Sequence, residues 1–401
     1  MIRFCRIGID ESEKMVVENP FKYGGIVTGP YFADRAREIS ELFSEMRNLG
    51  RVFLVSPRRY GKTCLIFNLR GKLKKEGYRP VYLDLNAYPG LASFAVAVTE
   101  KVSKALESSA DKLAKLISAL KYLRPRIEVG PDGSLAAGVE MIAPGREALP
   151  ALLEGLHYCE QLAAKKGQKL VIAIDEFSDL AKYDGQIVEK AIRSEIQSHT
   201  HIGYIFSGSS QSVMLAMVRD TQRAFYRLGR IMELGPIERD EYMKFILKWF
   251  KKGGYRLKEV NFEVLFDAAE DVPYSIQRMC NILWEKGRST RAITQKMVEQ
   301  LPMIVARQDS AHFELIWQGA SQGQKILLMA LAREQDPRPF SKDFQFTYGI
   351  GPSSSIKASL DSLVKKGILY KMPAGKYKFA DTFMRYWILN LAEADSPIPH
   401  I

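Results

Sequence analysis

Cysteine is scarce in this sequence, with only Cys5, Cys64, Cys159 and Cys280 among 401 residues. Zinc and iron–sulfur sites need cysteines and histidines in closely spaced groups, and the wide spacing here excludes a metal site of that kind. The sequence also lacks the dense cysteine framework of small secreted domains. We therefore expect free core thiols and a cytoplasmic protein.

Long apolar runs are absent as well. No run approaches the roughly 20 apolar residues that cross a membrane, and the N-terminus lacks the basic-then-apolar pattern of a secretion signal. A membrane-spanning protein is therefore not expected. With 46% hydrophobic and 26% charged residues, the composition is that of a folded protein, and the length predicts two or three domains.

Positive charge is in excess. The sequence has 58 Lys and Arg against 46 Asp and Glu, a net charge of +12, and its pI is near 9.3. This balance favours a polyanionic partner such as nucleic acid. A basic surface that is merely solvated is the alternative.

Residues 51–65 contain the most informative pattern in the chain. The apolar run from Val52 to Val55 predicts a buried strand, and Gly61-Lys62-Thr63 opens an amphipathic helix. A phosphate-binding loop needs a glycine so that the backbone closes round phosphate, a lysine for the β- and γ-oxygens, and a hydroxyl for Mg²⁺. The usual first glycine is replaced by Ser56. The residues expected to bind nucleotide are Ser56, Pro57, Arg58, Arg59, Tyr60, Gly61, Lys62, Thr63 and Cys64, with Lys62 also catalytic.

A second apolar run, residues 169–174, ends in the carboxylates Asp175 and Glu176. With Thr63, Asp175 is expected to hold Mg²⁺, and Glu176 to orient and deprotonate the attacking water. A third strand over residues 202–206 leads to Ser207 and Ser209, which we expect to sit beside the γ-phosphate as sensors. For residues 169–176, the alternative is a buried strand with solvated acids at its end.

These motifs resemble the prokaryotic P-loop ATPases of the STAND and AAA+ type. The resemblance includes the runs Asn19 to Gly24 and Phe32 to Arg35 with Glu38, and it extends to a C-terminal winged helix. This resemblance implies ATP and Mg²⁺ as cofactors and slow ATP hydrolysis. Members of this family accept serine at the first loop position. In this family the N-terminal arm lies near the base, which suggests Phe21 and Tyr23 as adenine contacts. Packing in the core is the other role open to them.

The expected fold is an α/β P-loop domain with a parallel sheet, because strands alternate with helices, followed by a helical lid and a winged helix. The expected divisions are an arm over residues 1–30, an ATPase core over 31–236 with a β-hairpin insertion at about 125–143, a lid over 237–308, a link at 309–320 and a winged helix over 321–392.

Four arginines precede the last expected strand of the core: Arg219, Arg223, Arg227 and Arg230. A spacing of four predicts that the first three share one helical face. Arg227 and Arg230 are candidates for an arginine supplied to a γ-phosphate, in the same chain or a neighbour. Arginines on a solvated face are the alternative.

The C-terminal segment is rich in lysine, and Lys357, Lys365, Lys376 and Lys378 are candidates for contact with a DNA backbone. The expected recognition helix has no arginine, asparagine or glutamine to read base edges. The sequence thus predicts an ATP-driven molecular switch that couples nucleotide state to DNA or partner binding through its winged helix. The alternative is a nucleotide-gated signalling or protein-interaction scaffold that binds no DNA and forms homo-oligomers with ATP.

Overall fold

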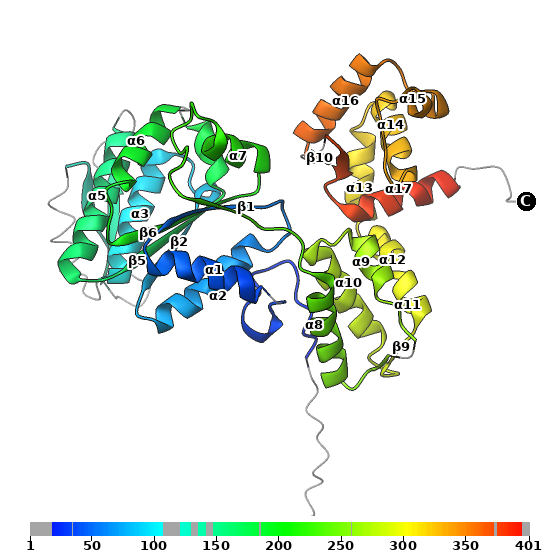
Figure 1. The fold of residues 1–401 in the computed structure, drawn as a ribbon, viewed down its shortest axis with the longest axis horizontal. Coiled ribbons are helices and arrows are strands. Elements are labelled where there is room, and N and C mark those ends of the chain that lie inside the picture. The colour runs from blue at the N-terminus through cyan, green and yellow to red at the C-terminus, as the bar shows by residue number, and fades with distance from the viewer. Residues whose placement is uncertain are drawn as a thin grey trace, which may run out of the picture. The chain divides into compact units, whose positions relative to one another are not determined.

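The computed structural model describes residues 18–33, 35–106, 121–129, 135–141, 147–183, 186–257, 259–372 and 375–394. The chain forms two compact units, one built from Gly25–Ile237 and the other from the rest of the chain (Figure 1). Within the described ranges, no helix is long and apolar enough to cross a membrane. Cys5 lies outside these ranges, and the other three cysteines are free.

The first unit contains alternating helices and strands. In chain order they are η1 (Gly29–Tyr31), α1 (Ala36–Arg47), β1 (Arg51–Val55), α2 (Lys62–Lys75), β2 (Arg79–Asp84), η2 (Leu85–Ala87), α3 (Leu91–Leu106), β3 (Leu123–Val129), β4 (Leu135–Met141), α5 (Ala148–Lys166), β5 (Leu170–Asp175), η3 (Phe177–Lys182), α6 (Gln186–Ile196), β6 (Ile202–Gly208), α7 (Gln211–Arg219) and β7 (Arg230–Glu233).

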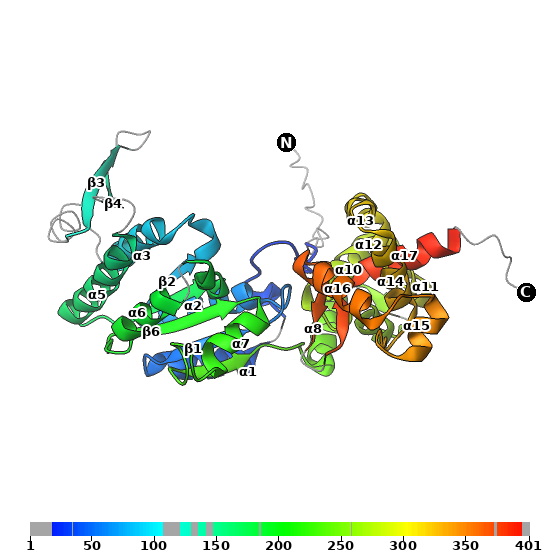
Figure 2. The same ribbon diagram turned by 90° about the horizontal axis from the view of Figure 1, so that it is seen from above.

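Five of these strands form one sheet in the order β2-β5-β6-β1-β7, and every neighbouring pair is parallel. The expected parallel P-loop sheet is confirmed. Because the strands are parallel, the carboxyl ends of β1, β5 and β6 meet at one edge of the sheet. Strands β3 and β4 pair antiparallel beside α3 (Figure 2), and the turn expected between them lies outside the described residues.

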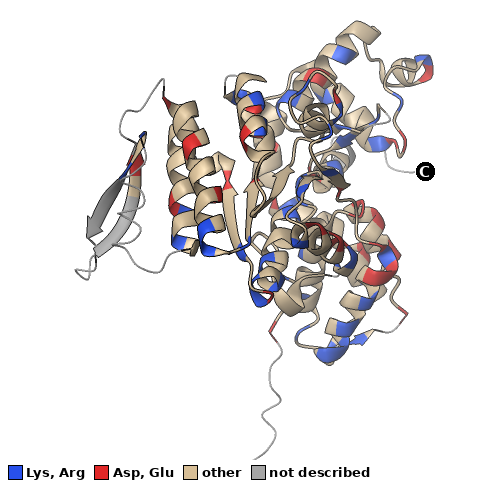
Figure 3. Cartoon of the chain, turned by 60° about the vertical axis from the view of Figure 1, so that its left-hand side comes forward, with Lys and Arg blue, Asp and Glu red and all other residues tan. Residues whose placement is uncertain are grey.

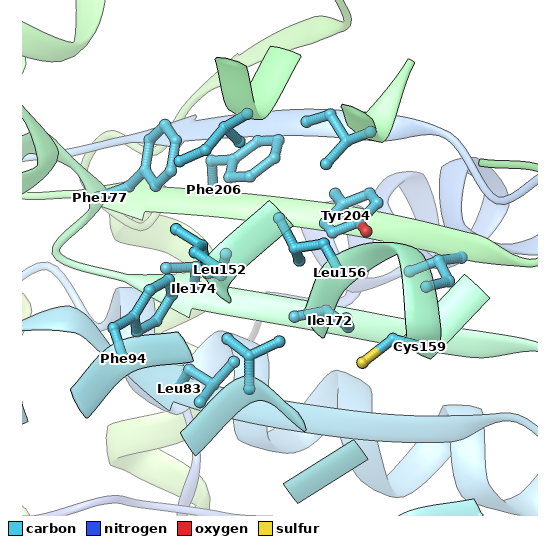
Figure 4. Packing of buried hydrophobic residues seen from close by; sticks show 14 of the residues in the cluster. Leu83, Phe94, Leu152, Leu156, Cys159, Ile172, Ile174, Phe177, Tyr204 and Phe206 are labelled. Atoms are coloured by element: carbon cyan, nitrogen blue, oxygen red, sulfur yellow. The ribbon is translucent and has the colours of Figure 1, made fainter. Parts of the chain in front are cut away.

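The sheet is buried on both faces. Alternate residues of β1 point to opposite sides: Phe53 belongs to the cluster formed with α3, α5, α6 and α7, whereas Leu54 belongs to the cluster formed with α1 and α2. Figure 4 shows the first cluster, in which Leu156 of α5 packs near Ile172 of β5. The unbroken apolar runs of the sequence follow from this burial, since a strand covered on both faces has no polar side.

The second unit is mainly helical. Its elements are α8 (Arg239–Lys252), β8 (Arg256–Leu257), α9 (Glu263–Ala269), α10 (Pro273–Lys286), β9 (Ala292–Ile293), α11 (Gln295–Glu299), α12 (Leu301–Gln308), α13 (Ser310–Gln318), α14 (Gln322–Arg333), α15 (Lys342–Tyr348), α16 (Ser353–Lys365), β10 (Leu369–Lys371), β11 (Tyr377–Phe379) and α17 (Thr382–Ala394). We call α8–α12 with β8 and β9 the lid helices.

Helices α14 to α16 and the antiparallel pair β10–β11 give the three helices and wing that the sequence predicts. The expected link at 309–320 is itself mostly helix α13. It is held to α17 because the indole Nε1 of Trp387 donates a 3.0 Å hydrogen bond to the Ser310 hydroxyl. Trp387 is 5% exposed and packs on Phe313, so it anchors α17 in the core of this unit.

Gly229 is fixed by a close approach of two backbones. A Cβ at this position would lie 2.1 Å from the carbonyl oxygen of Arg51, and backbone atoms cannot rotate away as a side chain can. We expect Gly229→Ala to lower the free energy of unfolding by about 1–3 kcal/mol. The measurement is guanidinium denaturation of the purified protein.

Gly71 supplies the matched control, because it lies inside α2 of the same unit and an added Cβ meets nothing within 4 Å. Gly71→Ala should raise the free energy of unfolding by about 0.5–1 kcal/mol, since alanine restricts the unfolded chain. Equal effects of the two substitutions would contradict the close approach.

Candidate nucleotide-binding site

The loop between β1 and α2 has the backbone of a phosphate-binding loop. Arg59 and Gly61 adopt left-handed conformations, with φ of 70° and 87°. The requirement at Gly61 is conformational rather than steric, because a Cβ there would meet nothing within 4 Å. The Ser56 side chain is buried, and its hydroxyl donates to the Pro57 carbonyl oxygen at 3.2 Å. Ser56 therefore folds back onto the loop and leaves room where a glycine usually stands.

Lys62 lies inside this loop and is 7% exposed. Its Nζ is 3.4 Å from the carbonyl oxygens of both Ser56 and Pro57. Burial lowers the pKa of Lys62, and the negative charges of Glu176 and Asp175 act in the opposite direction. A buried ammonium with two long contacts to neutral oxygens is suited to a stronger acceptor, and phosphate oxygens are such acceptors.

Asp175 is the centre of the site, at 3% exposure. Its Oδ2 accepts hydrogen bonds from the Thr63 hydroxyl at 2.7 Å and the Tyr82 hydroxyl at 2.9 Å. Its Oδ1 accepts from the Glu176 backbone N–H at 3.0 Å and from the Ser207 hydroxyl. Four donors around one carboxylate are the partners that an ionised, acceptor-only group needs.

The side-chain oxygen atoms of Thr63 and Asp175 also suit Mg²⁺ as ligands. Mg²⁺ prefers hard oxygen ligands, keeps several of its waters, and usually takes one or two carboxylates together with substrate phosphates. A hydroxyl and a carboxylate 2.7 Å apart, beside a phosphate-binding loop, offer that combination.

Glu176 follows directly and has a left-handed backbone, with φ of 52°. Such a conformation in a residue other than glycine costs about 1–3 kcal/mol and is found mostly at functional sites. The Glu176 Oε2 accepts from the Ser209 hydroxyl at 2.7 Å and from the Ser209 N–H at 3.3 Å. The carboxylate is thus held away from Asp175, at the same edge of the sheet.

The two serines predicted as phosphate sensors contact carboxylates in this structure. Ser207 is fully buried and bonds Asp175, and Ser209 bonds Glu176. The structure therefore places them where they orient the two acids.

Tyr82 is a site residue that the sequence did not reveal. It lies on β2, opposite Ala173 of the neighbouring strand β5, and its ring packs on Phe67 with 4.9 Å between centroids. Burial and the negative charge of Asp175 raise the pKa of Tyr82, so the phenol stays protonated and donates. Only the strand order brings it near Asp175, and no spacing in the sequence signals that order.

Arg35, 3% exposed, joins three parts of the first unit. One guanidinium nitrogen donates to the carbonyl oxygens of Tyr60 at 3.3 Å and Gly235 at 2.7 Å. The other donates to the Glu38 carboxylate at 2.6 Å and to the Pro236 carbonyl oxygen at 3.4 Å. One buried cation therefore connects the phosphate loop to the segment at the C-terminal end of this unit.

Cys64 has a similar connecting role. Its Sγ accepts from the backbone N–H of Val27 at 3.3 Å, and burial raises the pKa of the thiol. The next turn of α2 continues this contact, because Asn68 donates to the Val27 carbonyl oxygen and accepts from the Gly29 N–H, both at 3.0 Å. Of the other predicted loop residues, Tyr60 is buried and Arg58 and Arg59 are exposed.

The assignment of Phe21 to the adenine site is wrong. Its ring is 0% exposed and packs in the second unit against Phe250 and Trp284, with centroid distances of 5.1 and 6.0 Å. A ring with no exposed face cannot stack on a base, so Phe21 follows the alternative of core packing. Tyr23 is 41% exposed and packs edge-to-face on Tyr274, and its contact with adenine stays a prediction.

The shared helical face of the arginines is also wrong, because α7 ends at Arg219 and the next residues form turns. Arg219 pairs with Glu233, and Arg223 pairs with the fully buried Glu189. This leaves Arg227 and Arg230 as the two candidates to be placed.

Arg230 pairs with Glu41 and Glu45 of α1 and lies opposite Val52, at the start of β1. The phosphate loop follows the other end of that strand, so Arg230 cannot serve the γ-phosphate of its own site. Arg227 is exposed, with a φ of 56°, and its guanidinium lies over the Tyr226 ring.

Two of the four predicted DNA-binding lysines have carboxylate partners within the second unit. Lys376 pairs with Asp336 at 2.7 Å, and Lys378 of the wing pairs with Glu270, the residue that follows α9, at 2.5 Å. Partly exposed ion pairs are weak, but they reduce the charge that the wing presents to a polyanion. Lys357 and Lys365 are exposed on α16.

Comparisons with known proteins agree with this architecture. Residues 32–279 match a family model described as an ATPase domain predominantly from Archaea, and residues 311–390 match one described as a probable winged helix domain. No curated protein matches the chain.

Two solved structures have the same fold. A Walker-type ATPase of Pyrococcus abyssi is 14% identical with a TM-score of 0.60, over 92% of this chain and 99% of that chain. The ORC2 protein of Aeropyrum pernix, in its ADPNP–ADP complexes, is 12% identical with a TM-score of 0.50, over 94% and 98%. At these identities the likeness shows the fold alone.

Tyr82→Phe tests whether the phenol orients Asp175. The ring and its packing on Phe67 remain, and only the hydroxyl that bonds the carboxylate is lost. Removing a hydrogen-bond partner of a metal-binding side chain costs about 10-fold or more in metal affinity or activity. We expect the Mg²⁺ concentration that half-saturates nucleotide binding to rise by about that factor.

Tyr183→Phe is the control for this substitution. It removes a phenolic hydrogen bond to the Tyr88 carbonyl oxygen at 3.0 Å, in the same unit but away from Asp175. Its Mg²⁺ titration should match that of the wild type. A Tyr82→Phe protein with an unchanged titration would remove Tyr82 from the site.

Proposed function

The chain belongs to the family of ATPase domains found predominantly in archaea, and from this premise we propose that it is a molecular switch that binds ATP with Mg²⁺ and hydrolyses it. The observation that carries this proposal is the contact between Thr63 and Asp175 at 2.7 Å, with Glu176 beside it at the mouth of the phosphate loop. ATP hydrolysis requires a hydroxyl and a carboxylate for the metal and a second carboxylate for the attacking water, all close together.

Each residue then has one task. Lys62 offsets the charge of the β- and γ-phosphates, while the loop N–H groups surround them. Thr63 and Asp175 hold Mg²⁺, which supplies charge neutralisation on the phosphate oxygens when bound. Glu176 positions a water and accepts its proton, and Ser209 fixes the carboxylate for that step.

The switch rests on Arg35. Arg35 bonds both Tyr60 and Gly235, so a rearrangement of the loop on nucleotide binding changes the hydrogen bonds that fix residues 235–237. These residues end the first unit, since the second resumes at Glu238. Nucleotide state is thereby coupled to the unit that contains the winged helix, and through it to DNA or another partner.

A nucleotide-gated scaffold that forms homo-oligomers is the second candidate. It is favoured by Arg227, an exposed arginine beside the edge strand β7 that is available to the site of a neighbouring copy. Growth in mass on adding ATP, in the absence of DNA and measured by light scattering, would support it.

Glu176→Gln and Lys62→Ala separate hydrolysis from binding. Glu176→Gln should keep ATP bound while turnover falls by about 10² or more, because the positioned base is lost. Lys62→Ala should abolish tight ATP binding. Calorimetric titration and phosphate release measure the two quantities.

Asp179→Asn is the matched control, since Asp179 lies three residues from Glu176 and its side chain pairs with Lys182. Its binding and turnover should be those of the wild type. Unchanged affinity in Lys62→Ala would remove the phosphate-loop assignment, and unchanged turnover in Glu176→Gln would place the base elsewhere.

Arg35→Lys tests the coupling. An ammonium keeps the charge, but its three donors on one nitrogen cannot reproduce the spread of the planar guanidinium. We expect ATP affinity to fall about 10-fold, the loss of roughly one charged hydrogen bond. Hydrogen exchange of the Gly235 and Ile237 amides should respond to ATP in the wild type and not in this variant.

Arg37→Lys, two positions away on α1, controls for a general effect on the helix. Arg37 is 88% exposed and bonds Glu41 at 2.9 Å. It should behave as the wild type. If residues 235–237 still respond to ATP in Arg35→Lys, the coupling does not pass through Arg35.

A further inference from the structure

A concentrated basic surface lies at one end of the lid helices. Residues 248–257 and 286–292 contain seven Lys and Arg and no Asp or Glu. They are the last turns of α8 and α10 with the segments that follow. We call this surface the lid basic face, and its members are Lys248, Lys251, Lys252, Arg256, Lys286, Arg288 and Arg291.

The two segments form one surface because their helix ends pack together. A Cβ at Gly253 would lie 2.2 Å from the Trp284 ring, so the turn after α8 rests directly on the last turn of α10. The Tyr255 hydroxyl donates to the Trp284 carbonyl oxygen at 2.7 Å, and Arg291 donates to the Gly253 carbonyl oxygen at 3.1 Å. Figure 3 shows Lys and Arg gathered at the lower end of these helices.

Most of this charge is uncompensated. Lys248, Lys251, Lys252, Arg256 and Lys286 are exposed, and none of them forms an ion pair within the described part of the chain. Lys252 lies over the Trp249 ring at 5.0 Å. Two acids lie at the margin: Glu259, which is exposed, and Glu285, which pairs with Arg288 at 3.4 Å and accepts from Asn19 at 2.8 Å.

Four carboxylates of this region lie elsewhere and are paired. Arg239 bonds Glu263, Asp267 and Asp271 at 2.7 to 2.9 Å. Glu270 pairs with Lys378 of the wing. The lid helices therefore separate their charges, and the positive charge left over is concentrated on the lid basic face.

Stabilisation of helix ends explains only part of this arrangement. Cations in the last turn of a helix interact favourably with its dipole, which accounts for Lys251, Lys252 and Lys286. It does not account for Arg256, which lies on β8, whereas Arg291, beyond the end of α10, bonds the Gly253 carbonyl oxygen that ends α8. These positions extend the positive surface past both helix ends.

We propose that the lid basic face binds the phosphate backbone of nucleic acid. Its cations are closely spaced and have few carboxylates to compete, so they can neutralise several phosphates at once and release their counterions. Contact with phosphates alone carries no sequence information, so binding should be independent of sequence. The inference concerns a surface outside the nucleotide site and does not rest on ATP hydrolysis.

An anionic membrane fits this surface less well. Adsorption to a bilayer combines basic residues with several apolar side chains that enter the interface. Beside the lid basic face, Leu247 is the one large apolar side chain that is exposed among the described residues, at 39%. Binding to lipid is therefore an outcome that the experiment must exclude.

The experiment compares two variants of equal charge in the full-length protein. The lid variant carries Lys248→Gln, Lys251→Gln, Lys252→Gln and Lys286→Gln. The winged-helix variant carries Lys357→Gln, Lys365→Gln, Lys376→Gln and Lys378→Gln. Binding to short labelled DNA duplexes of unrelated sequences is followed by fluorescence anisotropy across a salt series without nucleotide. Thermal unfolding verifies that both variants fold.

For the wild type, the logarithm of affinity should fall with the logarithm of salt at about 0.9 per neutralised phosphate. The lid variant should flatten this slope by about one unit for each lysine that touches a phosphate, by the same amount on every duplex. The winged-helix variant should change the slope less than the lid variant, because Lys376 and Lys378 already have carboxylate partners and only Lys357 and Lys365 are exposed without an ion pair among the described residues.

Four results would overturn the proposal. An equal loss in both variants would make net charge the cause. A loss in the winged-helix variant alone would assign the contact to that domain. A wild type that does not bind duplexes but binds phosphatidylserine–phosphatidylcholine vesicles would make the surface a membrane site, and one that binds neither would make it a solvated face.

Discussion

The hydrogen bond from Thr63 to Asp175 joins residues 112 positions apart in the chain, and it forms because β1 and β5 are parallel strands of one sheet. A buried carboxylate is costly unless donors surround it. The donors to Asp175 come from the start of α2, from β2, from β6 and from the backbone that follows β5. The requirement of one buried carboxylate therefore fixes the relative positions of several elements of the first unit.

The parts of this site that sequence predicts are those whose chemistry is local. One group is Gly61 to Thr63 and the other is Asp175 with Glu176. Each group stands at or after the carboxyl end of an apolar strand that is buried on both faces of the sheet. Tyr82 and Arg35 escape prediction because their partners lie on other strands and loops. The contacts of Ser207 and Ser209 with the two carboxylates escape prediction for the same reason, since they depend on strand order, and the role of these serines as phosphate sensors stays a prediction.

Two errors have more specific causes. The arginine spacing suggested a helix, but the Asp220 side chain accepts from the Gln222 N–H and forms a turn in place of a further helical turn. The family resemblance suggested Phe21 as an adenine contact, but here it fills an aromatic cluster with Phe250 and Trp284. A sequence pattern indicates that an aromatic side chain is present, but it does not indicate which other residues that side chain packs against.

Both connections between the two units begin beside the phosphate loop. One follows Gly24, and the residues after it are held by Cys64 and Asn68 of α2, the helix that the loop opens. The other precedes Glu238 and is held by Arg35, which also bonds the loop at Tyr60. The polypeptide chain passes between the two units at these two points. In the proposed switch, a small rearrangement of the loop would act on both connections together, because both are attached to residues of the loop or of the helix that follows it.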